Sequence, residues 1–275
     1  MRKKRVLPGF GLSLGFTMLY MSLFVLIPLS IVFIQTSQLG WKKFAGVITN
    51  ERVLHSYQVS LTTSFAAAVV NAIFGLLIAW VLVRYTFPGK RLLDGLIDLP
   101  FALPTAVAGI TLTTLYAENG WIGKILSVFH IKVAFTPLGI IVALTFIGLP
   151  FVVRMVQPVL QNIDKEVEEA ASSLGASRFQ IFVKIILPEI FPALLAGFSL
   201  AFARALGEYG SVVFIAGNMP MKTEIAPLMI MTKLEQYDYA GATAVATVML
   251  IVSLLFLLLI NMIQSWSRRH ELKSE

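Results

Sequence analysis

The sequence contains no cysteine, few charged residues and none of the short motifs that identify common hydrolytic sites. Without cysteine there can be no disulfide, no thiolate nucleophile and no cysteine-ligated metal. The three histidines, His55, His130 and His270, lie too far apart in the sequence to form a ligand-spaced pair. The patterns Gly-x-x-x-x-Gly-Lys-Ser/Thr, Gly-x-Ser-x-Gly and His-Glu-x-x-His are absent. We therefore expect no P-loop ATP site, no metal or other cofactor, and no bond chemistry carried out by this chain.

The scarcity of charge also excludes a large water-exposed surface. Only 13% of the 275 residues are charged and 57% are hydrophobic, whereas about 25% charged residues is usual for a soluble domain. A net charge of +7 could indicate binding to nucleic acid. The basic residues flank apolar stretches instead of clustering with aromatic residues, so we expect membrane lipid, and not nucleic acid, around this chain.

Six apolar stretches approach the length of about 20 residues that a helix needs to cross a bilayer. The third is the weakest, because Pro100 and Pro104 interrupt it and it could be bent. The first follows a basic N-terminus, as in a secretion signal, but it is longer than a signal core of about 7–15 residues, so we expect it to be retained. These stretches predict an all-α membrane protein with a single transmembrane domain over residues 1–275. They are residues 10–34, 59–83, 97–116, 135–156, 191–216 and 243–263.

The distribution of lysine and arginine between the loops predicts the orientation. Six crossings place both termini on one side, and that side, with residues 84–91 and 154–184, carries 14 Lys and Arg residues. The opposite loops carry seven. Because short cytoplasmic loops are enriched in Lys and Arg, we expect both termini and residues 154–184 in the cytoplasm.

The longest polar segment runs from Asp164 to Pro188 and has the pattern of two short helices. Asp164 is a candidate N-cap for the first helix and Gly175 for its left-handed C-terminal cap. Ser177 and Gln180 have the spacing of a capping box at the start of the second helix, and Pro188 limits its length. One face of each helix would be apolar, which predicts either an exposed ridge that docks another protein or a loop packed on its own chain. The ridge residues are Val167, Ala170, Ala171, Leu174, Phe179, Phe182, Val183 and Ile186.

This segment resembles the "EAA" loop of ABC importer permeases of type I architecture. The resemblance is carried by Glu169, Ala170, Ala171, Gly175, Ile185, Leu187 and Pro188 at the spacing typical of that family. It implies that about residues 157–190, here named the coupling loop, contain a helix that docks into a groove of a cytoplasmic ATPase. A channel or a secondary transporter, the alternatives from other classes, would not need such a loop.

Charged residues also occur where apolar ones are expected. Arg204 and Glu208 lie four residues apart in the fifth stretch, so they could form a structural ion pair, line a translocation path or snorkel to the interface. Asp98 begins a proline-broken stretch in which hydroxyls such as that of Thr105 could line a cavity. The alternative is a kinked helix whose threonines bond back to their own backbone. The charged outer loop, residues 217–241, is a candidate dock for a binding protein or simply a solvated loop.

Much of the chain, from near residue 5 to about residue 264, resembles the T-type permease subunit of bacterial sulfate and thiosulfate importers. The resemblance is carried by residues 5–10, 98–109, 150–154, 157–160 and 214–218. It implies a subunit in the bacterial inner membrane that pairs with a second, homologous permease. It also implies two copies of an ATP-binding subunit and an extracytoplasmic sulfate-binding protein. The stretch Arg204–Glu208 is shared with molybdate and tungstate permeases, which would act as homodimers and remain the alternative.

Overall fold

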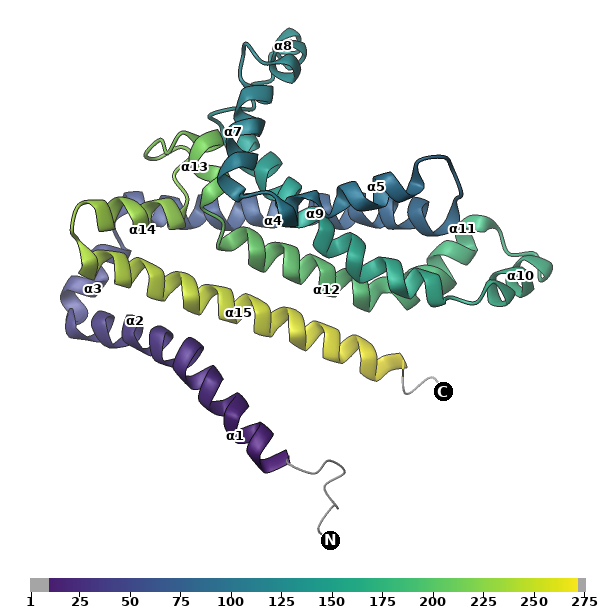
Figure 1. Cartoon of the computed structure of the whole chain (residues 1–275), viewed down its shortest axis with the longest axis horizontal. Helices are drawn as coiled ribbons and strands as arrows, with labels where there is room; N and C mark the ends of the chain where they lie inside the picture. The colour runs from purple at the N-terminus through teal and green to yellow at the C-terminus, as the bar shows by residue number, and fades with distance from the viewer. Residues whose placement is uncertain (1–9, 272–275) are drawn as a thin grey trace.

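The computed structural model describes residues 10–271, and their side chains as far as residue 263. Residues 10–271 contain helices and no strands, which confirms the predicted all-helical class (Figure 1). The helices, in order, are α1 (Phe10–Met21), the π-helical turn η1 (Ser22–Leu26), α2 (Ile27–Gln38), α3 (Trp41–Ile48), α4 (Glu51–Arg84), α5 (Lys90–Ile97), α6 (Leu99–Ala102), α7 (Thr105–Tyr116), α8 (Trp121–Val128), α9 (Pro137–Asn162), α10 (Lys165–Ser173), α11 (Arg178–Ile181), η2 (Phe182–Ile186), α12 (Leu187–Leu206), α13 (Gly210–Ala216), α14 (Ala226–Glu235) and α15 (Tyr239–Glu271).

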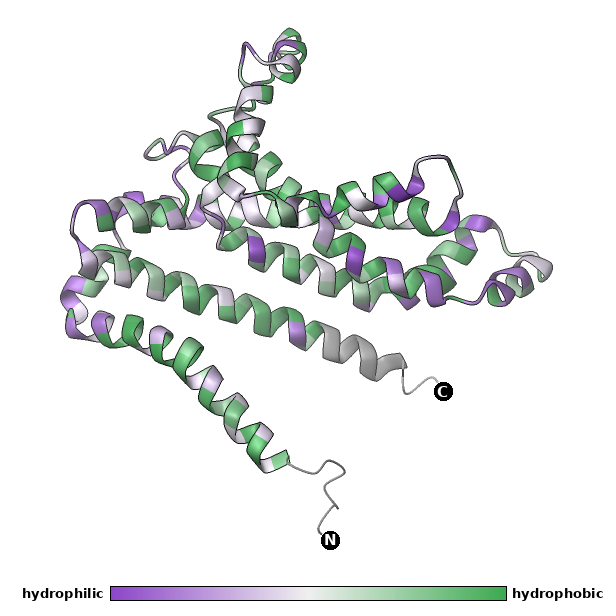
Figure 2. Cartoon of the chain, in the orientation of Figure 1, coloured by the Kyte–Doolittle hydropathy of each residue, from purple (hydrophilic) through white to green (hydrophobic). Residues whose placement is uncertain are grey.

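Five helical stretches within residues 10–271 are long and apolar enough to cross a membrane. They are Phe10–Gln38, Glu51–Arg84, Pro137–Asn162, Arg178–Leu206 and Tyr239–Ile263. Figure 2 shows that these ribbons are mostly hydrophobic, whereas α10 is strongly hydrophilic. The predicted stretch 97–116 is not one helix but lies across α6 and α7, because Pro104 lacks an N–H group and its neighbour Leu103 has extended backbone.

Two long helices contain a π-helical turn just before a proline. In the second of these turns the N–H of Leu187 bonds to the carbonyl of Phe182, five residues earlier. This wider turn accommodates Pro188, which cannot donate a backbone hydrogen bond. The prediction that Pro188 ends the second loop helix is therefore wrong, because the helix continues from Arg178 to Leu206. The predicted fifth stretch, 191–216, is instead interrupted after Leu206, where Gly207 ends α12 and a separate α13 follows.

Small residues bring α4, α9 and α12 into close contact at the centre of the fold. A Cβ atom on Gly75 of α4 would lie 2.8 Å from Val152 of α9, and one on Gly197 of α12 would lie 2.8 Å from the Cα of the same valine. Close backbone approach at small residues is the usual basis of helix packing in membranes, where burial from water gives no driving force. Val152 is completely buried between these two glycines.

The interrupted helices α7 and α13 also meet at glycines. A Cβ on Gly109 of α7 would lie 2.5 Å from the carbonyl oxygen of Ser211 at the start of α13. A Cβ on Gly210 would lie 2.2 Å from Oγ1 of Thr105, the first residue of α7. The break between α6 and α7 and the break between α12 and α13 are therefore next to each other.

Figure 1 shows α10 and α11 at one end of the long axis and α3 and α14 at the other.

We predict that Gly109→Ala destabilises the fold by about 1–3 kcal/mol, because the new methyl group would overlap the backbone of α13, which cannot rotate away. Gly46→Ala on α3 is the matched control, since nothing lies within 4 Å of a Cβ there. That control should be neutral or raise stability by up to about 1 kcal/mol. Thermal unfolding of the two purified variants in detergent measures the difference, and equal melting temperatures would contradict the close packing of α7 on α13.

Candidate coupling surface and helix breaks

The coupling loop is built from two short helices whose ends are capped as the sequence predicts. Gly175 has φ +88°, a left-handed conformation. The N–H of Gly175 bonds to the carbonyl of Ser172, and that of Ala176 to the carbonyl of Ala171, each at 3.0 Å. This pair of bonds is a Schellman cap. Ser177 and Gln180 form both bonds of the predicted capping box. Asp164 occupies the N-cap position of α10, but its side chain makes no capping bond.

One side of the loop is attached firmly to the transmembrane helices. Glu168 of α10 forms an ion pair with Arg84, the last residue of α4. The Arg84 guanidinium lies 5.5 Å from the ring centroid of Trp80, which in turn packs edge-on against Phe182. Ile186, which follows Phe182 by one turn, is completely buried in the same cluster. The predicted alternative that the loop packs on its own chain is thus correct for this side.

The other side of the loop is exposed. Leu174 is 90% exposed and Phe179 is 75% exposed, and Val167 and Val183 are exposed as well. Exposed apolar side chains gathered among charged residues are typical of a protein contact surface. Phe182 and Ile186, which the sequence places on the same ridge, are turned inward instead. The large side chains of the exposed ridge are therefore Val167, Leu174, Phe179 and Val183, and the small side chain of Ala170 is exposed as well.

The seven residues of the sequence motif divide between these two sides. Glu169, Ala170, Gly175 and Pro188 are exposed, whereas Ala171, Ile185 and Leu187 pack against the buried cluster of α4, α9 and α12. The motif thus combines exposed positions with anchors that join the loop to the membrane helices.

Arg204 and Glu208 form an ion pair of 2.5 Å at the end of α12. Glu208 is almost fully buried, and its other oxygen accepts bonds from the backbone N–H and the hydroxyl of Ser211, at 2.9 and 3.0 Å. The carboxylate therefore closes the break between α12 and α13, because a negative group at a helix N-terminus satisfies free N–H groups. Thr105 lies against Gly210 beside this break.

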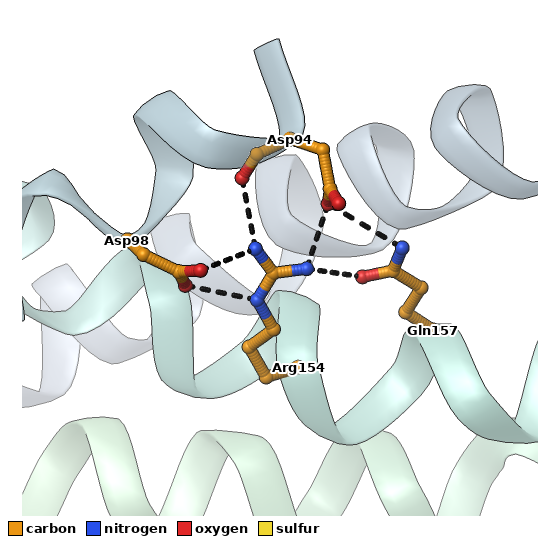
Figure 3. Close-up of polar contacts among 4 residues, drawn as sticks. All are labelled: Asp94, Asp98, Arg154 and Gln157. Carbon is orange, nitrogen blue, oxygen red and sulfur yellow. Dashed lines mark hydrogen bonds and ion pairs between the residues drawn. The ribbon is translucent and has the colours of Figure 1, made fainter. Parts of the chain in front are cut away.

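Asp98 lies in a different place, where α9 contacts α5 and α6. Figure 3 shows Arg154 of α9 surrounded by Asp94, Asp98 and Gln157. Nε and Nη2 of Arg154 donate to the two Asp98 oxygens at 2.9 and 2.6 Å, and Nη1 donates to Asp94 Oδ1 and to Gln157 Oε1, each at 2.7 Å. Nη2 also donates to the backbone carbonyl of Asp94 at 2.8 Å. The sequence patterns singled out Asp98 but did not identify Arg154 as its partner, because the two are 56 residues apart.

Three threonines of α7 bond to the backbone of their own helix. Thr111, Thr113 and Thr114 each donate to the backbone carbonyl four residues earlier. For these three, the expected alternative of a helix whose threonines bond to their own backbone is correct. Thr105 differs from them, since it is the first residue of α7 and lies at the contact with α13.

The end of the fold that carries α3 and α14 holds two further ion pairs that sequence reasoning missed. Arg52 forms two bonds of 2.7 Å with Glu224, which is 1% exposed. Lys233 lies 2.9 Å from Asp238 in the predicted outer loop. This ammonium group, together with the N–H of Gly241, lowers the pKa of Asp238 below its ordinary value. The loop 217–241 is therefore ordered by ion pairs and is not merely a solvated connection.

Long apolar helices joined by an exposed helical loop are the arrangement of a multi-span membrane protein. Residues 71–271 match the family of binding-protein-dependent transport system inner membrane components, and the chain belongs to this family. It is 54% identical to the sulfate transport system permease protein CysT of Salmonella typhimurium over 95% of both chains. It is 48% identical to the protein of the same name from Synechocystis over 92% of this chain and 89% of the relative. These relatives confirm the resemblance that the sequence motifs predicted.

Solved structures of ABC transporters share the fold. A chain of a bacterial alginate ABC transporter, solved in complex with an alginate pentasaccharide-bound periplasmic protein, covers 91% of both chains with a TM-score of 0.74 and 20% identity. A chain of the MetNI methionine ABC transporter in an inward-facing conformation covers 79% of this chain and 95% of its own, with a TM-score of 0.54 and 21% identity. The multi-pass, inner-membrane character of the chain follows from this family and from its apolar helices.

Two adjacent glutamates allow the attachment of the loop to be tested with a matched pair of variants. We predict that Glu168→Gln speeds amide hydrogen exchange in α10 by about two- to five-fold, since a partly exposed ion pair contributes about 0.5–1 kcal/mol. Glu169→Gln should leave the exchange unchanged, because the exposed Glu169 side chain is not part of the ion pair with Arg84. Equal exchange rates in both variants would show that Arg84 does not hold α10.

Proposed function

We propose that this chain is the transmembrane permease subunit of an ATP-driven importer that carries sulfate into the cell. The observation that supports this most strongly is the 54% identity to a sulfate permease over 95% of both chains. Thiosulfate, a dianion of similar shape, is the further substrate that the sequence resemblance implies. Nothing in these relatives favours the molybdate or tungstate alternative. The absence of a P-loop motif supports a division of labour in which a partner subunit hydrolyses ATP.

The exposed ridge of the coupling loop is proposed to dock into the ATP-binding subunit, of which the complex would contain two copies. Four large apolar side chains are exposed to water there, so burying them against a partner protein would be favourable. Glu169 is a further exposed residue of the same helix, α10. The anchored side, with Glu168 and Phe182, would then pass a displacement of the ridge to α4 and α12. A second, homologous permease subunit would complete the membrane part of the complex.

The ends of the long axis are proposed to face opposite sides of the inner membrane. The excess of Lys and Arg on the side of the coupling loop supports a cytoplasmic location for α10, α11 and both termini. The end with α3, α14 and the loop 217–241 would then face outward and meet a sulfate-binding protein. The related alginate transporter, which was solved with its periplasmic protein, supports such a partner.

The translocation path is proposed to pass the adjacent helix breaks, where Thr105, Arg204 and Glu208 lie. Backbone without helical hydrogen bonds at membrane depth is tolerated where protein covers it or where it lines an aqueous cavity. Arg204 remains partly exposed beside the buried Glu208, so part of its positive charge is available to an anion. Asp98 is not proposed for the path, because Arg154 holds both of its oxygens.

The substrate is tested by uptake of labelled sulfate in cells with and without this chain, in a strain that has no other sulfate importer. We expect deletion to abolish uptake. In the parental strain, an about ten-fold excess of molybdate should leave most of the uptake intact, because the importer would discriminate by a higher affinity for sulfate than for molybdate. Uptake that survives deletion, or that molybdate removes, would reject the sulfate assignment.

Docking is tested by Gly175→Val, with Gly175→Asn as its control. Valine is strained in a left-handed conformation by about 1–2 kcal/mol, whereas asparagine tolerates it. We expect the valine variant to lose most ATPase co-purification and uptake, and the asparagine variant to keep most of both. Glu169→Lys should also weaken co-purification, because it reverses the charge of an exposed motif residue on α10. Normal co-purification and uptake in the valine and lysine variants would reject the proposed docking surface.

A further inference from the structure

We propose that Arg154 is a positioning residue that makes the broken segment α5–α6 move together with α9, so that displacement of the coupling loop reaches α7. This inference rests on the proposed function and deepens it. Arg154 ends one of the stretches that carry the sequence resemblance, residues 150–154, but neither the coupling-loop motif nor the proposed docking surface includes it. The inference comes from the bonds that this arginine makes, from the chain connections around it and from the position of α7.

The first observation is that every N–H group of the Arg154 guanidinium donates a hydrogen bond. Its five N–H donors make five hydrogen bonds, to Asp98, Asp94 and Gln157. Two parallel bonds to Asp98 form the rigid fork typical of arginine–carboxylate pairs, which fixes orientation as well as distance. Lysine could not reproduce this arrangement, because an ammonium group has only three donors around a single atom.

The second observation is that these bonds hold both sides of a helix joint. Asp94 belongs to the last turn of α5, and its backbone carbonyl accepts from Arg154. Asp98 lies between α5 and α6 and is both the C-cap residue of α5 and the N-cap residue of α6. A cation at the C-terminal end of α5 is favourable for the helix dipole. One side chain of α9 therefore fixes the position of the whole joint, and Phe151 of α9, packed edge-on against Phe101 of α6, supports it.

The third observation concerns the route from the coupling loop. Arg154 lies two turns before the end of α9, and only Ile163 and Asp164 separate α9 from α10. In contrast, α5 is joined to α4 through residues 85–89, which are not helical and end in Gly89 with φ +83°. This five-residue connection fixes its two helices relative to each other less directly than the two-residue connection between α9 and α10 does. The stiff connection from α10 to α5 therefore runs through α9 and Arg154.

The fourth observation is the position of α7, the helix that follows α6 in the chain. Beyond Pro104 the chain enters α7, which packs at Gly109 and Thr105 against α13, next to the break closed by Glu208. A shift of α6 would change the position of α7 at this contact. Arg154 thus joins the coupling loop to the helix breaks of the proposed path, although it belongs to neither.

The test uses the full complex of this chain with its partner subunits in proteoliposomes, with sulfate import and ATP hydrolysis measured together. We expect Arg154→Gln to lower sulfate imported per ATP hydrolysed by about ten-fold, the size of a lost coupling contact, while the rate of ATP hydrolysis changes less than about two-fold. Arg91→Gln, an exposed arginine on α5, is the matched control and should keep the parental ratio. An unchanged ratio in Arg154→Gln would overturn the proposal.

A distance measurement keeps the proposal testable even if Arg154→Gln fails to assemble. Because the chain has no cysteine, spin labels can be placed at Leu92→Cys on α5 and Met155→Cys on α9, both exposed positions. We expect one narrow distance distribution that stays the same with and without ATP, and a broad distribution in Arg154→Gln. A parental distance that changes with ATP would overturn the proposal. A parental complex that hydrolyses ATP but imports no sulfate would instead reject the proposed substrate.

Discussion

An interrupted helix in a membrane must find new partners for its free backbone groups, and this constraint shapes the whole chain. Each backbone group left without a partner in hydrocarbon costs several kcal/mol. Glu208 satisfies the N-terminal end of α13, and Arg154 satisfies the C-terminal end of α5. Both are charged side chains whose own charge is balanced, by Arg204 in one case and by two aspartates in the other. The breaks are thus specific structures and not weak points in the packing.

The same polar contacts connect the parts of the chain that a transport cycle must move together. The coupling loop is joined to α4 by Glu168 and Arg84 and continues directly into α12. Through α9 and Arg154 it reaches α5 and α6, and through the glycine contacts of α7 it reaches α13. The proposed importer would need a rigid connection at the loop and a change of packing at the proposed path. The rigid contacts are charged or aromatic, whereas the contacts between α7 and α13 depend on small residues.

Most of the features that depend on the conformational preferences of single residues could be predicted from the sequence. Gly175 as a left-handed cap, the capping box at Ser177 and the weak stretch around Pro100 and Pro104 all follow from conformational preferences of single residues, and the structure has each of them. The family resemblance depended on the same local pattern and was correct. The length of the second loop helix was wrong, because a π-helical turn before Pro188 lets the helix continue, and no residue type signals such a turn.

The contacts that sequence reasoning missed are those between distant residues. Arg154 and Asp98, Arg84 and Glu168, and Arg52 and Glu224 pair across 56 to 172 positions. A charged residue in or near an apolar stretch shows that a partner is needed, but tertiary packing decides which one. The ridge was predicted only in part for the same reason, since the helical period defines a face but not which portion of it the membrane helices cover.

The central claim, that the adjacent helix breaks line an aqueous path, can be tested by single cysteines in this cysteine-free chain. Thr105→Cys and Tyr209→Cys would lie at the two breaks, and Leu258→Cys on the exposed apolar surface of α15 serves as the control. Because only a thiolate in contact with water reacts readily, a hydrophilic thiol reagent reports hydration. We predict labelling of both break positions at rates that differ with and without ATP, and no labelling of the control. Absence of labelling at both breaks in both conditions would contradict this claim.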